Sequence, residues 1–317
     1  MRSEKFYNRT ATVLSGGVGG AKLVLGMARW VQGAHLNIIV NTADDAVFHG
    51  LHVSPDLDTT LYTLAGIANP KTGWGIVRDT FHASSALEKY GEETWFHLGD
   101  RDLGTHILRT KLLNEGKTLT EITYRLSKQH GVQTRILPMS EQRVETLVKL
   151  GKRWIPFQDY FVLERWKGVV NGIRFKGIRQ AEPTPQVMDA LGKVDLIIFA
   201  PSNPVVSILP ILSLHGFKDF LKKARALKIA VSPFIGNRAF SGPAKELIET
   251  MGYEGSSLGL AKFYKGLIDL FVIDRQDAET QEEIESLGIH VIVTNTTMKT
   301  LRDKVRLAKE ILEKSIR

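Results

Sequence analysis

Six short apolar runs, separated by stretches with helical periodicity, constrain the fold of this chain more than any other feature. The runs cover 11–14, 36–42, 194–201, 227–233, 267–274 and 289–295. Each is nearly continuous rather than alternating, which is typical of strands buried on both faces of a parallel sheet. Helical stretches between them are expected at 21–30, 216–226, 242–251, 277–287 and 298–314. The pattern predicts a doubly wound, mostly parallel, Rossmann-like α/β fold that binds ligands outside the carboxyl ends of its strands.

Residues of about 60–180 interrupt this rhythm. They contain several helical stretches and few continuous strands, and the alternating, charged segment 157–178 suggests short antiparallel strands. We interpret the region as a mainly helical insertion with a small β element that caps the ligand edge of the sheet. The chain has no Gly/Ser-rich linker, so residues 1–317 are expected to form a single domain.

A run of glycines follows the first strand in the sequence SGGVGGAK, residues 15–22. A Gly-rich turn between a strand and a helix lets backbone N–H groups approach a phosphate at the helix N-terminus. The run departs from the G-x-G-x-x-G fingerprint at Lys22, and it lacks the Gly-Lys-Ser/Thr of a Walker A loop. The candidate phosphate-binding residues are therefore Gly16, Gly17, Gly19, Gly20 and Lys22. The alternative is a tight turn that needs glycine only for its geometry.

Polar residues also follow two later strands. Because the carboxyl ends of parallel strands share one edge, they are expected near the glycine run, where small polar groups could hold a guanine or a ribose. The alternative is that the neighbouring prolines only end the strands. The candidates are Ser202, Asn203, Ser232, Gly236 and Asn237.

Four aspartates gather between residues 44 and 58, namely Asp44, Asp45, Asp56 and Asp58. Carboxylates at a strand edge suit Mg²⁺, which takes one or two of them together with phosphate oxygens of a substrate. They could instead hydrogen-bond a hydroxyl or amide group of a ligand. Asp58 alone could be the N-cap of a helix that starts near residue 59. Asp44 and Asp45 are the candidate metal ligands and catalytic residues.

The segment HLGDRDLGTH, residues 97–106, places Arg101 between two acidic residues. Its guanidinium suits bidentate recognition of a phosphate or carboxylate, and Arg101 is a candidate catalytic residue. The alternative is a helix start held by surface ion pairs, which contribute little stability. His97 and His106 lack the spacing of a zinc site. No nucleophile motif is found, so the chemistry indicated is direct displacement at phosphorus.

Composition excludes several classes of protein. The chain has no cysteine, which rules out disulfides, thiol catalysis and thiolate metal sites. The net charge of +8 suits anionic ligands, but its lysines and arginines lie at helical spacing without a nucleic-acid-binding pattern, so no nucleic-acid partner is expected. No apolar run is long enough to span a membrane, and the first residues do not form a signal peptide. We expect a cytoplasmic enzyme.

Taken together, the motifs resemble the CofD family, the 2-phospho-L-lactate transferases of coenzyme F420 biosynthesis. The resemblance runs in order over nearly the whole chain. The matching segments are SGGVGGAK (15–22), NTADD (41–45), SPDLDTTLYTLAG (54–66), WGIVRDTF (74–81), HLGDRDLGTH (97–106), ILPMS (136–140), APSNPVVSILPIL (200–212), AVSPFIGNRAFSGPAKELIETMG (230–252) and FVIDRQD (271–277).

The resemblance implies a transferase that uses Mg²⁺ and releases GMP. Such an enzyme passes a phospho-three-carbon acid from its guanosine diphosphate ester to the deazaflavin Fo, with the glycine run cradling the diphosphate. In the family, Fo is bound at the positions of Asp58 and His97. The second of these is often lysine, so His97 is a departure. The family also suggests a homodimer.

A related branch of the superfamily binds nucleotide sugars and regulates carbon metabolism. Its members share the glycine run and the acidic segment but lack LGDRD and its neighbours. The presence of HLGDRDLGTH and ILPMS therefore favours the transferase. No residue rule separates lactate, enolpyruvate and glycerate derivatives as the transferred acid.

Overall fold

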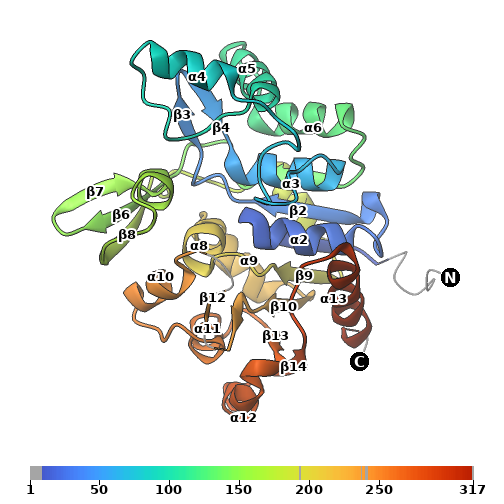
Figure 1. Cartoon of the computed structure of the whole chain (residues 1–317). Helices are drawn as coiled ribbons and strands as arrows, with labels where there is room; N and C mark the ends of the chain where they lie inside the picture. Colours follow the sequence, from blue (N-terminus) through green and yellow to red (C-terminus); the bar gives the residue numbers. More distant parts are fainter. Residues whose placement is uncertain (1–8, 193, 237, 240–241, 316–317) are drawn as a thin grey trace.

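The fold is built on one seven-stranded parallel sheet. The structure is a computed structural model that describes residues 9–192, 194–236, 238–239 and 242–315. All neighbouring strands of the sheet are parallel. Their order across the sheet is β14 (His290–Thr294), β13 (Leu270–Asp274), β10 (Leu227–Val231), β9 (Leu196–Phe199), β1 (Ala11–Ser15), β2 (Leu36–Val40) and β5 (Arg135–Pro138), as Figure 1 shows. The predicted doubly wound α/β fold is confirmed.

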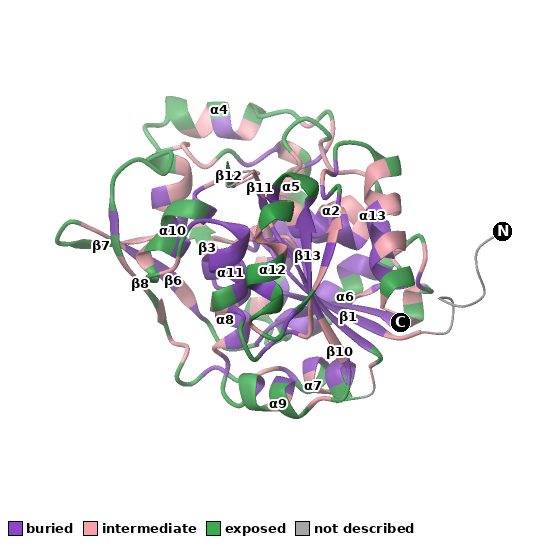
Figure 2. Ribbon diagram, turned by 90° about the horizontal axis from the view of Figure 1, so that it is seen from below, coloured by how far each residue is buried: buried purple, intermediate pink, exposed green. Residues whose placement is uncertain are grey.

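The strands alternate their side chains between two hydrophobic cores, one on each face of the sheet. Val13 and Ile38 belong to one core, whereas their neighbours Leu14 and Ile39 belong to the other. The first core is covered by α2 (Gly17–Met27), α3 (Pro55–Ala65), α6 (Leu119–Gln129) and α13 (Leu301–Lys314). The second is covered by α7 (Pro185–Gly192), η3 (Pro204–Ile208), α8 (Leu209–Leu212), α9 (Phe217–Lys223), α10 (Ala244–Thr250), α11 (Ser257–Phe263) and α12 (Gln281–Glu285). Figure 2 shows the buried strands surrounded by helices with exposed outer faces. Burial on both faces explains why the strands read as continuous apolar runs.

The region expected to be one insertion is divided in two by a strand of the main sheet. Residues 135–138 pair with β2 as β5, which the sequence analysis did not identify as a strand. The run is only four residues long and has helical neighbours, so periodicity could not distinguish it. Before it lie β3 (Ala46–Phe48), β4 (Leu51–Val53), α3, α4 (His82–Lys89), α5 (Asp100–Asn114) and α6. After it comes a small antiparallel sheet in the order β7 (Arg153–Pro156), β6 (Glu145–Leu150) and β8 (Val170–Lys176), with a helical turn η2 (Asp159–Leu163) where strands were expected.

The remaining elements are short connections. They are η1 (Gly33–His35), β11 (Phe234–Ile235), β12 (Arg238–Ala239) and η4 (Arg275–Thr280). Within the described residues, no single helix is both long and apolar enough to cross a membrane. One pair, Pro204–Leu212 and Phe217–Lys223, passes that test only when joined, and the two helices are bent by 82°.

The chain reverses its direction across the sheet between β1 and β9. From β1 it proceeds to β2 and β5 on one side, and it then returns to β9 on the other side and continues to β10, β13 and β14. The loops after β1 and β9 therefore diverge from each other. The crevice between them is the topological switch point, where doubly wound folds bind ligands. The glycine run and Ser202 both lie at this point.

Candidate active site

The glycine run forms the start of α2 and is tied to its surroundings by hydrogen bonds. The helix begins at Gly17, earlier than the expected residue 21, with Gly16 as its N-cap. Ser202 Oγ accepts a hydrogen bond from Gly16 N at 3.1 Å and donates one to Gly16 O at 2.7 Å, so the two switch-point loops are joined. Gly17 N donates to Asp56 Oδ1 at 2.7 Å. The first backbone donor of the helix thus binds a carboxylate of the protein.

Asp44, Asp45 and Asp56 lie beside this helix N-terminus, and we call these three residues the carboxylate cluster. All three are buried. The amide of Asn41 joins two of them, because its Nδ2 donates to Asp44 Oδ2 at 3.2 Å and to Asp56 Oδ2 at 3.0 Å. Oδ1 of Asp44 and Oδ1 of Asp45 are buried and accept no hydrogen bond of ordinary geometry within the described part of the chain. Two buried carboxylate oxygens therefore remain without a hydrogen bond of ordinary geometry, although the Thr146 hydroxyl is close enough to Asp44 to lower its pKa.

Burial makes the cluster electrostatically unfavourable when all its carboxylates are ionised. Burial and then the charge of Asp56 raise the pKa of Asp44 well above its ordinary value. Burial raises the pKa of Asp56 to about 6, although hydrogen bonds from Asn41 and Gly17 oppose the increase. Burial also raises the pKa of Asp45, against the opposing contact with His52. A cation would relieve this repulsion.

Asp45 is held by two residues in and just after the β3–β4 hairpin (46–53), namely His52 and Ser54. Its Oδ2 accepts a hydrogen bond from Ser54 Oγ at 2.6 Å and lies 3.0 Å from His52 Nε2. His52 is part of β4, which pairs with β3, and β3 begins directly after Asp45. The short hairpin therefore brings His52 back to Asp45.

Asp58 is not the N-cap of helix α3, and both of its carboxylate oxygens are bound to Arg109. Helix α3 begins at Pro55 with Ser54 as N-cap, which places Asp58 within its first turns. Arg109 of α5 binds Asp58 through both terminal nitrogens, and both side chains are buried. The interpretation of Asp58 as an N-cap is wrong, because Pro55 already provides the favourable first helical position.

The LGDRD motif forms a reciprocal pair of helix caps with the earlier WGIVRDTF segment. Asp79 accepts hydrogen bonds from the backbone N–H groups of Arg101 and Asp102 at the start of α5. Asp100 in turn accepts hydrogen bonds from the backbone N–H groups of His82 and Ala83 at the start of α4. Two carboxylates at helix N-termini stabilise both helices, so much of this motif is architectural.

Arg101 and His97 lie exposed near this pair of caps. One guanidinium nitrogen of Arg101 donates to Val77 O at 3.1 Å. The His97 ring packs edge-on to Phe81, with centroids 6.1 Å apart. Asp58 and His97, which the resemblance assigns to one ligand, have different neighbours and very different exposure.

Most candidates from the far half of the chain have structural partners. Asn203 Oδ1 caps η3 by accepting from Val205 N and Val206 N. Ser232 Oγ lies 2.9 Å from Ser257 Oγ and accepts from Phe234 N at 3.1 Å. These contacts favour the architectural alternative for the two side chains.

The other candidates differ in their surroundings. Gly236 has a positive φ of 59° beside Gln276, and Asn237 lies outside the described residues. Gly20 packs against Ser15 and Ser202. Lys22 is half-buried, and burial and then the charge of Lys304 on α13 lower its pKa.

Sequence reasoning assigned no role to Asp56, His52 or Arg109. Asp56 was visible as part of the acidic segment. His52 and Arg109 gave no signal, because their role depends on contacts between elements that are distant in the sequence.

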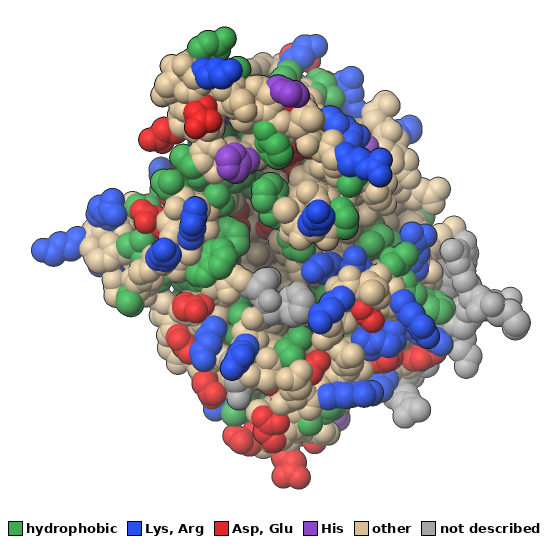
Figure 3. All heavy atoms as spheres, in the orientation of Figure 1, with side chains coloured by type: hydrophobic (Ala, Val, Ile, Leu, Met, Phe, Trp, Pro, Cys, Tyr) green, Lys and Arg blue, Asp and Glu red, His purple; other side chains and the backbone are tan. Residues whose placement is uncertain are grey.

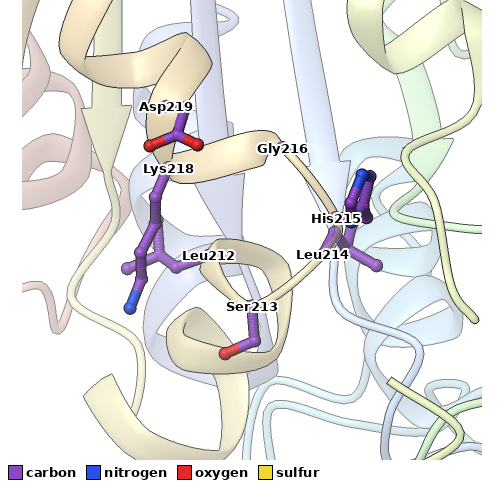
Figure 4. A pocket seen from close by; sticks show the side chains of 7 residues that line it. All are labelled: Leu212, Ser213, Leu214, His215, Gly216, Lys218 and Asp219. Atoms are coloured by element: carbon purple, nitrogen blue, oxygen red, sulfur yellow. The ribbon is translucent and has the colours of Figure 1, made fainter. Parts of the chain in front are cut away.

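The surface near the site is hollowed. Figure 3 shows a depression between the lobe with α4 and α5 and the elements below it, with hydrophobic side chains on its walls. A separate open pocket of about 390 Å³ lies at the turn between α8 and α9, and no residue of the carboxylate cluster lines it (Figure 4).

The fold and the site define a doubly wound α/β protein with a buried acidic site beside a Gly-rich helix N-terminus at the switch point. The sequence model of the family "2-phospho-L-lactate transferase CofD" matches residues 11–308. The chain belongs to the CofD family and is a transferase of coenzyme F420 biosynthesis, which confirms the resemblance seen in the sequence.

Curated relatives match along almost their whole length. The 2-phospho-L-lactate transferase of Methanocaldococcus jannaschii is 40% identical over 306 residues, 95% of this chain and 97% of that protein. That of Methanosarcina mazei is 38% identical over 301 residues, 95% and 99% of the two chains. The phosphoenolpyruvate transferase of Streptomyces griseus is 38% identical over 307 residues, 95% and 96%. The solved structure of protein BH3568 from Bacillus halodurans shares the fold, with a TM-score of 0.62. It covers 98% of this chain and 99% of that one, at 14% sequence identity.

Proposed function

We propose that this enzyme transfers a phospho-three-carbon acid from its guanosine diphosphate ester to a terminal hydroxyl of the deazaflavin Fo. The hydroxyl oxygen forms a bond to the phosphorus that carries the acid. The bond from that phosphorus to the oxygen of the guanosine-bound phosphate breaks, so GMP leaves with the electron pair. The hydroxyl proton passes to a base, and a carboxylate of the cluster is suited to receive it.

The observation that carries this proposal is the carboxylate cluster beside the start of α2. Phosphoryl transfer depends mainly on positioning and on neutralising charge, and it needs no protein nucleophile. The N–H groups of Gly16 and Gly17 are bound to Ser202 and Asp56, so the backbone N–H groups that follow them in the glycine run are the ones that can hold diphosphate oxygens at the positive end of the helix. The side chains of Arg101 and His97 are exposed, so they can contact the donor or the acceptor.

The residues present fit Mg²⁺. Within the described residues, no three His, Asp or Glu side chains form a ready metal-binding group. Mg²⁺ needs only one or two carboxylates, since water and substrate phosphates complete its shell. Asp44 and Asp45 would hold it through their unsatisfied Oδ1 atoms. The ion would supply charge neutralisation to the diphosphate.

A coupled assay tests the function. The protein is incubated with Fo, GTP, a guanylyltransferase and either phospholactate, phosphoenolpyruvate or phosphoglycerate, and products are identified by mass spectrometry. We expect Fo to gain the mass of one phospho-acid and GMP to appear in equal amount. A relative named 2-phospho-L-lactate transferase and one named phosphoenolpyruvate transferase are each 38% identical to this chain, so the assay compares the acids directly. Binding of a UDP-sugar without any transfer would contradict the proposal and favour the regulatory branch.

Mg²⁺ should stabilise the protein more at pH 7.5 than at pH 5. The folded-state pKa of Asp56 is raised from its ordinary 3.8 to about 6, so its ionisation costs folding free energy. The protonated Asp56 therefore contributes on the order of 2–3 kcal/mol to the free energy of unfolding of the metal-free protein. This contribution is complete below about pH 4 and is lost as the pH rises through about 6. The measurement is the thermal midpoint with MgCl₂ and with KCl of equal ionic strength. Equal Mg²⁺ effects at both pH values would contradict it.

A further inference from the structure

The small antiparallel sheet projects from the body of the protein and carries much of its positive charge. We call residues 145–179, which comprise β6, β7, η2, β8 and their connections, the arm. Figure 1 shows the arm extending away from the central sheet, at the left of the view. The arm contains eight Lys or Arg residues and three Asp or Glu residues, so its net charge is +5, against +8 for the whole chain. Roughly a tenth of the chain therefore carries more than half of the net positive charge.

The turn between β6 and β7 and the loop that leads into β8 lie side by side at the free end of the arm. Leu150 pairs with Val170 across the two strands, and Gly151 N donates to Asn171 Oδ1 at 3.0 Å. A Cβ added at Gly168 would lie 3.8 Å from Leu150 Cδ2. Residues 151–153 and 167–169 therefore form one surface, which we call the arm tip.

The arm tip exposes basic side chains without acidic partners. Lys152, Arg153 and Lys167 are exposed, and none of them forms an ion pair with a residue that the structure describes. Further back along the arm, Lys176 pairs with Glu145 at 3.4 Å. Figure 3 shows Lys and Arg side chains gathered at this end of the molecule. The tip thus presents positive charge that the protein itself does not neutralise.

The loop 163–169 is held in a fixed conformation by its contacts with η2. Arg165 and Trp166 both have left-handed backbone conformations, with φ of 51° and 46°, which residues other than glycine rarely adopt. Trp166 N donates to Tyr160 O at 2.8 Å, and Tyr160 Oη donates to Trp166 O at 3.2 Å. One face of the Trp166 ring stacks on Phe161, with centroids 5.3 Å apart. These contacts fix the direction in which the loop presents its side chains.

Apolar side chains of this loop are exposed beside the basic ones. Val169 is 78% exposed, and Leu163 and Trp166 are each 48% exposed. A single exposed apolar residue is ordinary in a protein surface. A projecting loop that presents Trp, Leu and Val among Lys and Arg is instead typical of a segment that enters the interface of a lipid bilayer.

We propose that the arm tip and the loop 163–169 dock on the surface of an anionic lipid bilayer. The exposed apolar side chains enter the head-group region, and Lys152, Arg153 and Lys167 contact lipid phosphates. A bilayer fits better than a nucleic acid, because a nucleic acid offers phosphates but no apolar region for Val169. The contact is peripheral, so it requires no membrane-spanning helix.

The docked surface is separate from the candidate active site. Thr146 N, near the start of β6, donates to Ala43 O at 2.7 Å, so the carboxylate cluster adjoins the base of the arm. The arm tip lies at the other end of the same strand. The inference therefore does not depend on which reaction the carboxylate cluster supports.

Sedimentation of the full chain with lipid vesicles tests the inference. Vesicles of phosphatidylglycerol and phosphatidylcholine in equal amounts are compared with vesicles of phosphatidylcholine alone. We expect half-maximal binding to the anionic vesicles at a lipid concentration about tenfold or more below that for the neutral vesicles. Binding should be lost when KCl is raised from about 50 mM to about 500 mM, because salt screens exposed charges.

Variants of the arm tip locate the contact. The double variant Lys152→Gln/Arg153→Gln should raise the lipid concentration for half-maximal binding about tenfold or more, since each basic residue near an anionic surface contributes roughly fivefold. Val169→Ser should raise it about threefold or more by removing apolar area. The matched control is Lys222→Gln/Lys223→Gln, which removes the same charge from exposed positions of α9 and should change the value less than about twofold. All the substituted side chains are exposed, so the thermal midpoint should stay unchanged.

Three results would overturn the inference. The first is a wild type that does not bind the anionic vesicles at low salt. The second is an equal loss of binding in the two double variants, which would mean that binding follows the net charge and not the arm. The third is a wild-type dimer, seen by light scattering, that Val169→Ser dissociates, because the arm tip would then be a contact between two copies of the chain.

Discussion

Asp44→Asn is expected to lower kcat by at least about 100-fold while raising the thermal midpoint of the metal-free protein. Asp44 would hold the cation that neutralises transition-state charge, and loss of one such stabilising interaction typically costs this much in rate. The stability rises because asparagine removes a buried negative charge that Asp56 repels, while its side-chain oxygen can still accept from Asn41. A gain of about 1 kcal/mol corresponds to roughly 1–2 °C in a chain of 317 residues. A steady-state assay measures kcat, and scanning calorimetry measures the thermal midpoint.

The opposite signs of the two effects make this prediction specific. An aspartate that mainly supports the fold would lose stability when changed, and its loss of activity would follow the loss of folded protein. The exposed Asp189→Asn serves as the control, with little change in either quantity. Full activity of Asp44→Asn in the presence of a chelator would contradict both the metal site and the role of Asp44.

Gly19→Ala is expected to destabilise the fold by about 1–3 kcal/mol or more, the usual cost of forcing a methyl group into a packed site. An added Cβ would lie 2.4 Å from Pro201 O, in the loop after β9. That oxygen belongs to the backbone, so neither side can move easily. The position needs glycine because α2 packs closely on the neighbouring loop, whereas the sequence suggested close approach by a diphosphate. The free energy of unfolding from urea titration provides the measurement.

Gly104→Ala is the matched control within α5. An added Cβ there meets nothing within 4 Å, and its φ is not positive. Alanine should therefore stabilise this exposed helical position by roughly 0.5–1 kcal/mol. If Gly19→Ala were as stable as the wild type but lost affinity for GDP, the phosphate-binding explanation of Gly19 would be correct and the packing explanation wrong.

The sequence alone determined the class of fold and the location of the site. Strands such as β9 (196–199) are buried on both faces, so their composition is apolar throughout and reveals them directly. The edge strand β5 was missed because its four residues carry too little periodicity. The position of Asp44 and Asp45 at the ligand edge was predictable, since polar residues that follow a parallel strand lie at that edge.

Only the tertiary structure decided which polar residues support the fold and which remain available for chemistry. Asp58 and Asp45 look alike in the sequence, yet one is bound on both oxygens by Arg109 and the other retains an unsatisfied oxygen. Arg109 lies 51 positions after Asp58, and no periodicity links them. The partners of a side chain depend on how separate elements pack, and local sequence encodes propensity and burial but not those long-range contacts.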